Sequence, residues 1–170
     1  MKRKTLLDEI QQTKGFPSVE AEVFLNLLRT AEALSAGPNG LLRDSGLSHS
    51  QYNVLRILRG AGDSGLCCRE IVDRMVTRDS DMTRLLDGLE GKGLVHRNRS
   101  ESDRRVIISQ ISPSGLELLA ALDAPMQAVH TAQFQHLSEP KLKRLLRLLE
   151  EARQGPARDS VMNQVGENDR

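Results

Sequence analysis

A group of polar side chains stands at the start of an amphipathic segment in the middle of the sequence. The segment places apolar residues at i, i+3, i+4 and i+7, which is one stripe of a helix. We expect Asp79 or Ser80 to cap its start and Gly91 or Gly93 to end it. Such a helix can present its N-terminal end to base edges in the major groove of DNA, so residues 79–92 are predicted to be a recognition helix. The side chains predicted to meet the bases are Ser80, Asp81, Thr83 and Arg84.

A second polar group lies at the turn of a β-hairpin that is expected directly after this helix. Residues 94–99 and 104–111 are typical of strands, the second by its Val and Ile content and its alternation, and residues 100–103 form the turn between them. The negative potential of a narrow minor groove attracts arginine side chains. The hairpin over residues 94–111 is therefore predicted to be a wing that enters the minor groove. The wing residues predicted to act there are Asp103, Arg104 and Arg105.

Further basic and hydroxyl side chains flank these two groups. Contacts from such residues to phosphates position a protein on DNA without specifying a sequence. The alternative for all these charges is an ordinary solvated surface, on which ion pairs contribute little. The predicted phosphate contacts are Ser50, Arg69, Arg74, Arg78, Arg97 and Arg99.

Total charge does not by itself indicate a nucleic-acid partner. The chain of 170 residues has a formal net charge of +1, and residues 66–112 hold nine Lys and Arg against eight Asp and Glu. Any DNA affinity must therefore come from the placement of positive charge. Asp81 would repel phosphates, and we expect it to accept from a cytosine amine or to hold Arg84 or Arg78.

Helices are expected over most of the chain, because apolar residues recur with a period near 3.6. Ser18 is predicted to cap a first long helix over residues 19–36. Residues 37–40 read Gly-Pro-Asn-Gly, which is expected to break or sharply kink this helix. Ser48 or Ser50 is predicted to cap the next helix.

The second half of the chain continues this pattern around the hairpin. A short helix over residues 67–75 is expected to meet the recognition helix at a helix-turn-helix corner. Ser112 followed by Pro113 is a helix start, and Pro125 is expected to kink or split the long helix that follows. Residues 137–140 start a last helix with a dense leucine face. The leucine stripes of these terminal helices require a partner, for which a second copy of the chain is the simplest choice.

Several short motifs together resemble the MarR family of bacterial transcription regulators, over about residues 18–153. The resemblance implies a mainly α fold with a small β-hairpin wing, in which a winged helix-turn-helix domain is flanked by N- and C-terminal dimerisation helices. In that family the residue matching Arg105 tends to enter the minor groove and Asp103 braces the wing. The matching residues are 83–87, 89–90, 92–95, 103–105 and 112–115.

The resemblance also implies a function. We expect a homodimer that binds double-stranded DNA at a pseudo-palindromic operator, with its two recognition helices about 34–36 Å apart. It would most simply be a repressor released by a small-molecule effector, bound in the crevice between the wing domain and the dimer helices. A ligand acts in this way only if its affinity differs between the two states.

The expected organisation has five segments. The winged helix-turn-helix domain lies between dimerisation helices, and the polar C-terminal segment has too few apolar residues to fold. The segments are 1–16, a flexible N-terminal segment; 17–46, an N-terminal helix contributing to dimerisation; 47–112, the DNA-binding domain; 113–153, the C-terminal dimerisation helices; and 154–170, a disordered tail.

Two alternatives to a ligand-responsive DNA-binding regulator remain open. Many family members carry a basic residue where this chain has Gly88, which weakens the expected DNA contact and favours a protein-interaction module without DNA binding. Cys67 and Cys68 stand near a helix start, where a thiol pKa can fall, so a thiol-based redox regulator is the second alternative. The alternative without a redox function is that the two cysteines are partly buried structural thiols.

Other classes of protein lack support in the sequence. No apolar run is long enough to span a bilayer, and Asp8 and Glu9 interrupt any signal-like start. Two cysteines without a disulfide spacing fit a reducing compartment, so we expect a cytoplasmic protein. The four histidines show no metal-ligand spacing, and no catalytic or cofactor-binding constellation is present, so neither an enzyme nor a cofactor or metal site is expected.

Overall fold

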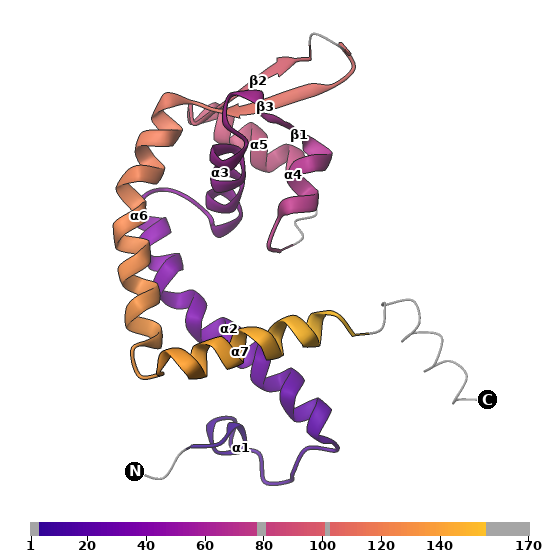
Figure 1. Cartoon of the computed structure of the whole chain (residues 1–170), viewed down its shortest axis with the longest axis vertical. Helices are drawn as coiled ribbons and strands as arrows, with labels where there is room; N and C mark the ends of the chain where they lie inside the picture. Colours follow the sequence, from indigo (N-terminus) through magenta and orange to yellow (C-terminus); the bar gives the residue numbers. More distant parts are fainter. Residues whose placement is uncertain (1–3, 78–80, 101–102, 156–170) are drawn as a thin grey trace, which may run out of the picture. The chain divides into compact units, whose positions relative to one another are not determined.

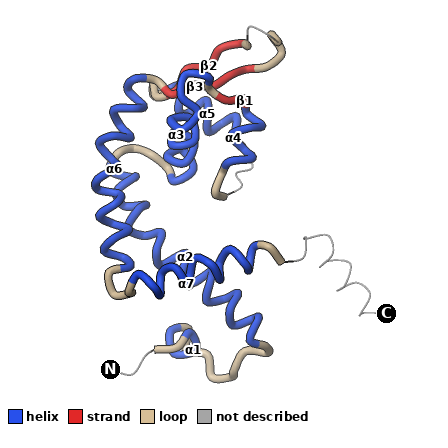
Figure 2. Tube along the Cα trace, in the orientation of Figure 1, coloured by secondary structure: helices blue, strands red, loops and turns tan. Residues whose placement is uncertain are grey.

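Helices make up most of the structure (Figures 1 and 2). In the part of the chain that the structure describes, three short strands form a single sheet. The computed structural model describes residues 4–77, 81–100 and 103–155, which form two compact units that divide after Val129. No helix among these residues is long and apolar enough to cross a membrane. The elements are α1 (Leu6–Glu9), α2 (Val19–Asp44), α3 (His49–Ala61), the 3₁₀ turn η1 (Gly62–Ser64), β1 (Leu66–Cys67), α4 (Cys68–Arg74), α5 (Met82–Gly91), β2 (Val95–Arg99), β3 (Ile107–Ile111), α6 (Pro113–Phe134) and α7 (Glu139–Arg153).

The sheet of the first unit is antiparallel, with strand order β1-β3-β2. The hairpin register runs from Val95 opposite Ile111 to Arg99 opposite Ile107, so the predicted hairpin is confirmed. Strand β1, which pairs Leu66 with Ser109, was not predicted. It is two residues long and therefore offers no alternation that a sequence pattern can show.

The apolar stripe predicted for residues 82–89 packs into the core of the helix-turn-helix. Met82, Leu86 and Leu89 are buried and Leu85 is half-buried. They join a cluster that is built from α3, α4, the sheet and α6. Burial of this stripe, at about 1.5–3 kcal/mol for each large side chain, fixes which face of α5 remains in solvent.

Hydroxyl caps start α2 and α3 as predicted. Ser18 Oγ accepts from Ala21 N at 3.2 Å at the start of α2. Ser48 and Gln51 form a reciprocal capping box at the start of α3, which selects Ser48 over Ser50 as the cap. These local interactions satisfy backbone groups that the first helical turn leaves without partners.

The predicted break at residues 37–40 is wrong, because α2 continues through Pro38 to Asp44. Likewise, Pro125 does not split α6. A proline inside a helix loses one hydrogen bond and costs about 3 kcal/mol. Pro38 itself is buried, and Leu42 and Met126, which follow the two prolines, are buried in the core, so packing offsets that cost.

The start of α6 is locked to the hairpin through Ser112 and Gly115. Ser112 Oγ donates to the carbonyl of Gly93 at 2.7 Å and accepts from Gly115 N at 3.0 Å. A Cβ atom at Gly115 would lie 2.5 Å from the carbonyl oxygen of Leu94 and 2.7 Å from Ile111 Cγ1. Only glycine therefore lets α6 approach the sheet this closely.

A two-pronged ion pair also fastens α6 to α3. Arg59 of α3 donates from Nη1 to Asp123 Oδ2 at 2.8 Å and from Nη2 to Asp123 Oδ1 at 3.0 Å. The hydrogen bond from Arg59 lowers the pKa of Asp123, and the same bond raises the pKa of Arg59. Arg56 adds a smaller favourable charge to Asp123.

The terminal segments differ in how much they fold. The N-terminal segment expected to be flexible contains α1, whose cap Thr5 accepts from Asp8 N, and buries Leu6. In the second unit, α7 begins after Ser138 with Pro140 in its first turn and has no buried residue. Most of the predicted disordered tail, residues 156–170, lies outside the described residues.

We predict that Gly115→Ala lowers the free energy of unfolding by about 1–3 kcal/mol, because the new methyl group overpacks the junction between α6 and the hairpin. Urea denaturation measures this change. Gly60→Ala is the matched control: a Cβ atom at Gly60 in α3 meets nothing within 4 Å. It should stabilise the protein by about 0.5–1 kcal/mol. Equal stability of the two variants would contradict the packing argument.

We predict that the stabilising effect of Asp123 depends on pH. Because the pKa of Asp123 is lowered in the folded state, its contribution is complete above its ordinary value of 3.8 and disappears as the pH falls through the folded pKa. Asp123→Asn should therefore be less stable than the wild type at neutral pH, and this difference should vanish in acid. Urea denaturation as a function of pH measures the difference. A difference that is the same at all pH values would contradict the ion-pair account.

Candidate nucleic-acid interface

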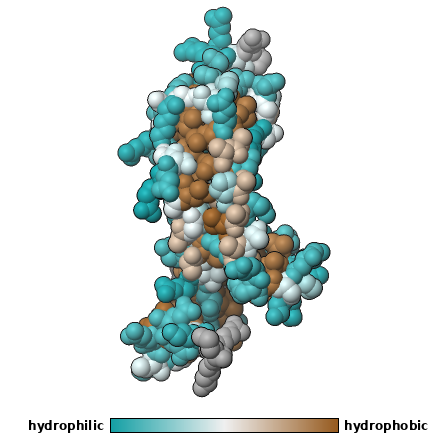
Figure 3. Space-filling model, turned by 90° about the vertical axis from the view of Figure 1, so that its left-hand side faces the viewer, coloured by the Kyte–Doolittle hydropathy of each residue, from teal (hydrophilic) through white to brown (hydrophobic). Residues whose placement is uncertain are grey.

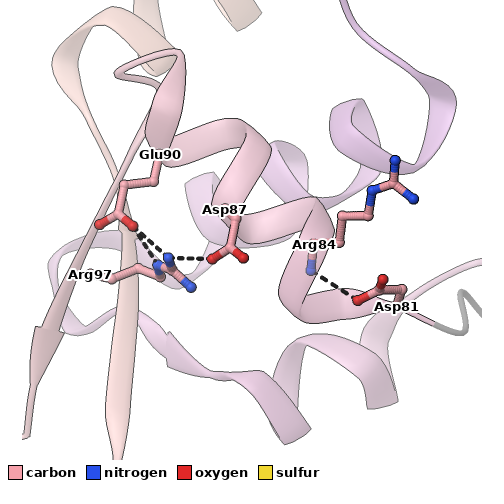
Figure 4. Close-up of polar contacts among 5 residues, drawn as sticks. All are labelled: Asp81, Arg84, Asp87, Glu90 and Arg97. Carbon is pink, nitrogen blue, oxygen red and sulfur yellow. Dashed lines mark hydrogen bonds and ion pairs between the residues drawn. The ribbon is translucent and has the colours of Figure 1, made fainter.

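The first turn of α5 exposes the side chains predicted to read bases. Thr83 and Arg84 are exposed on it. The cap is Asp81, whose carboxylate accepts from Arg84 N at 3.0 Å (Figure 4), so the expected cap at Asp79 or Ser80 is wrong. The carboxylate of Asp81 thus serves the helix start and does not hold the guanidinium of Arg84. Of the other residues expected here, Ser80 and Arg78 lie outside the described residues.

The next turns of α5 carry two carboxylates that bind Arg97 of β2 (Figure 4). Arg97 Nε donates to Glu90 Oε2 at 2.8 Å, and Nη2 donates to Glu90 Oε2 and to Asp87 Oδ1, each at 2.5 Å. The hydrogen bond to Glu90, more than that to Asp87, raises the pKa of Arg97 above its ordinary value. Arg97 was predicted to contact phosphate, but its guanidinium is engaged inside the domain, so we leave it out of the candidate interface.

The turn of the wing holds Arg104 and Arg105 in solvent. Asp103 Oδ1 accepts from Arg105 N at 2.9 Å, and the carbonyl of Asp103 accepts from Val106 N at 2.9 Å. Arg104 and Arg105 were expected at the start of the return strand, but β3 begins only at Ile107. The hydrogen bonds to Asp103 form a tight turn there, which holds both arginines outside the strand ladder.

The other predicted phosphate contacts are spread around this surface. Ser50 is half-buried in the first turn of α3, whereas Arg69 and Arg74 on α4 and Arg99 at the end of β2 are exposed. All four belong to elements of the first unit. Their role as phosphate contacts stays a prediction.

The charged side chains of α5 and the wing fall into two groups, those with a partner inside the domain and those without an ion pair. Within the described part of residues 81–112, every carboxylate has an internal partner: Arg84 N for Asp81, Arg97 for Asp87 and Glu90, and Arg105 N for Asp103. In the same segment, four exposed guanidinium groups have no ion pair among the described residues. These belong to Arg84, Arg99, Arg104 and Arg105. Near-zero local charge therefore coexists with a set of arginines that can receive an anion.

Comparison with known proteins places this geometry in a family. The sequence model of the MarR family matches residues 47–107. The crystal structure of a MarR transcription factor from Planctomyces limnophilus is 37% identical, with a TM-score of 0.62 over 80% of this chain and 98% of that one. The chain belongs to the MarR family. Proteins of this family are transcription regulators that bind DNA.

Two further relatives extend the comparison. The transcriptional regulator MhqR of Bacillus subtilis is 32% identical over 98 residues, which cover 58% of this chain and 66% of MhqR. BpsR of Bordetella bronchiseptica is 19% identical, and its structure superimposes with a TM-score of 0.74 over 84% of this chain and 100% of that one. The second similarity is one of fold.

Gly88, which departs from the basic residue common in the MarR family, has a structural neighbour. A Cβ atom there would lie 3.1 Å from Gln51 Nε2. Gln51 caps α3 and accepts from Lys92 Nζ at 3.2 Å, and Lys92 also donates to the carbonyl of Gly46 at 2.5 Å. Glycine therefore leaves room for a side chain that joins the start of α3 to the end of α5. The sequence pattern did not identify this role of Gln51 and Lys92, because it depends on contacts between distant segments.

The two cysteines stand where β1 meets α4. Both are free thiols, Cys67 half-buried and Cys68 exposed. Cys67 N donates to Glu70 Oε2 at 2.8 Å, and this bond lowers the pKa of Glu70. Of the two thiols, Cys68 is the one that solvent reaches more readily.

We predict that Asp81→Ala lowers the free energy of unfolding by about 1 kcal/mol, because α5 loses its N-cap. Asp81→Ser should retain most of the stability, since serine is an equally good cap. Urea denaturation of the two variants measures the difference. An alanine variant as stable as the wild type would show that the cap does not stabilise α5.

Proposed function

We propose that this chain is a homodimeric, sequence-specific repressor that binds a pseudo-palindromic operator. The observation that carries the proposal is that the described carboxylates of residues 81–112 have internal partners, while four arginines of the same segment face solvent. Arg84 would contact a base edge from the first turn of α5 in the major groove. Arg104 and Arg105 would enter the minor groove from the wing, and Arg99 would bind phosphate.

The role proposed for each residue follows from its position in the domain. Thr83 and Arg84 lie at the N-terminal end of α5, which is the end that a recognition helix directs at base edges. Arginine binds a guanine edge through two hydrogen bonds, which contribute about 1–3 kcal/mol of discrimination. Asp103 would keep the wing turn in shape without touching DNA, because it is engaged by Arg105 N.

Exposed apolar faces of the helices outside the wing support a homodimer. On α2, the exposed fractions of Phe24 and Leu28 are 61% and 54%, and on α7 that of Leu146 is 58%. Hydrophobic residues reach the surface on the face drawn in Figure 3. Apolar helix faces of this kind gain free energy when a second subunit covers them. Twofold symmetry would then present two recognition helices to successive turns of one duplex.

A small-molecule effector is part of the proposal. In BpsR of Bordetella bronchiseptica, 6-hydroxynicotinic acid regulates DNA binding. By analogy, an effector of this chain would favour a dimer whose recognition helices no longer match the operator. The effector can shift this equilibrium only by its difference in affinity for the two forms.

A fluorescence-anisotropy titration tests the function. The probe is the duplex upstream of this protein's own gene, and a scrambled duplex of the same composition is the control. The proposal expects tight binding to the first duplex with two subunits per site, and weak binding to the second. Equal, weak binding to both would instead favour the protein-interaction module.

We predict that Arg84→Ala relaxes base preference at one position of each half-site, with a loss of about 1–3 kcal/mol of discrimination. The reason is that its guanidinium is exposed on the first turn of the recognition helix. Titrations against single-base variants of the operator measure the preference. An unchanged preference at every position would contradict the assignment of Arg84.

We predict that Arg105→Ala weakens binding of operator and scrambled duplexes alike, because a wing arginine responds to the potential of the groove more than to a single base edge. Anisotropy at several salt concentrations measures the effect. Arg147→Ala, which removes an exposed arginine of α7, is the matched control and should leave affinity unchanged. A result in which Arg147→Ala weakens binding as much as Arg105→Ala would contradict the placement of the interface.

A further inference from the structure

Arg97 is a residue of the wing strand β2, and its side chain binds the recognition helix α5. It lies in the middle of β2, opposite Ser109 of β3. Its guanidinium binds Asp87 and Glu90 on α5, and its side chain is 21% exposed, against 56% and 40% for the two acids (Figure 4). This is an ion-pair cluster that joins the two elements proposed to enter adjacent grooves.

Both ends of the cluster are attached to parts of the fold that cannot easily shift. On the helix side, Leu86 and Leu89 are buried in the core, one residue away from Asp87 and Glu90. On the sheet side, Val95 and Ser109 are buried, and the ladder between β2 and β3 continues on both sides of Arg97. The cluster therefore joins two well-packed elements and is not a contact of the exposed wing turn.

We propose that Arg97 is a positioning residue for DNA recognition, which sets the wing at a fixed angle to the recognition helix so that both reach their grooves on one duplex together. The proposal rests on the proposed function. Arg97 acts through Arg84 at one end and Arg104 and Arg105 at the other, and it does not contact DNA itself.

The physical reason is that two linked contacts reinforce each other only when their geometry permits both at once. An operator offers matched features in the major and minor grooves, so a rigid angle benefits its binding. A scrambled duplex is held by phosphate contacts, which are independent of sequence and tolerate a loose wing. Loss of Arg97 should consequently reduce operator binding more than general DNA binding.

Replacing the two acids separates this role from a phosphate contact. If Arg97 bound phosphate, Asp87→Asn with Glu90→Gln would release its guanidinium and strengthen binding to the operator and the scrambled duplex equally. If Arg97 positions the wing, the same double variant breaks the cluster. It then loses preference for the operator, although its net charge is more positive and its general DNA affinity rises.

The experiment compares the ratio of operator to scrambled-duplex affinity in the full-length protein. The variants are Arg97→Ala, Arg97→Lys and the Asp87→Asn, Glu90→Gln double variant. Arg97→Ala and the double variant should each lower the ratio by roughly tenfold, within the range for residues coupled in one charge network. Arg97→Lys should recover part of the ratio, because an ammonium keeps the charge without the guanidinium's fixed fork of donors.

Arg99→Ala is the matched control, since Arg99 is the exposed arginine next but one on the same strand. It should weaken both duplexes alike and leave the ratio unchanged. Circular dichroism and urea denaturation establish that each variant is folded before its binding is interpreted. If Arg97→Ala does not fold, the double variant and Arg97→Lys decide the question.

The outcomes are distinguishable. A folded Arg97→Ala protein with an unchanged ratio would overturn the inference, and so would a double variant that binds both duplexes more tightly without losing preference. A loss of stability without a change in the ratio would assign Arg97 a merely structural role and would also overturn it. A wild-type protein that binds both duplexes equally would refute the proposed function itself.

Discussion

Burial of one apolar stripe of α5 determines how the rest of the interface is arranged. Once Met82, Leu86 and Leu89 face the core, the helical period places Thr83 and Arg84 in solvent and leaves Asp87 and Glu90 beside the hairpin. The stripe thus decides which groups of α5 remain in solvent, where the proposed DNA contacts lie, and which groups face the hairpin. Packing in the core and the proposed recognition surface both follow from the way α5 is turned about its axis.

Negative charge is the second constraint on this surface. A domain with almost equal numbers of acids and bases can bind a polyanion only if its acids are occupied or turned away. Here the acids serve the fold: Asp81 caps a helix, Asp103 closes a turn, and Asp87 and Glu90 hold Arg97. The same interactions that stabilise the domain therefore leave its remaining arginines available.

Features that depend on neighbouring residues could be predicted from the sequence. The stripe of α5, the caps at Ser18 and Ser48 and the start of α6 after Ser112 are local, and each is confirmed. The alternation of the second strand likewise predicted the hairpin. The family resemblance is confirmed by the family model over residues 47–107 together with the 37% identical structure from Planctomyces limnophilus. The base, groove and phosphate contacts of the individual side chains remain predictions.

Features that depend on distant contacts could not be predicted. Pro38 lies within a continuous helix and is itself buried, as is Leu42 one turn further on, and no local pattern shows that. Arg97 was predicted to be one more phosphate contact, since its partners lie seven and ten residues away on another element.

The predicted caps of α5, Asp79 and Ser80, lie two positions and one position before the observed cap, Asp81. Such errors in the boundary of an element are common where several polar residues follow one another.

The central claim is that one domain reads both grooves of the same operator. Hydroxyl-radical footprinting tests it most directly, because the radicals cleave the sugars from the minor-groove side and report protection at single-nucleotide resolution. We expect two symmetric half-sites, each with protected minor-groove positions where the wing binds, spaced about one helical turn apart, and loss of that protection in Arg105→Ala. Uniform, weak protection along the duplex, unaffected by Arg105→Ala, would contradict the claim.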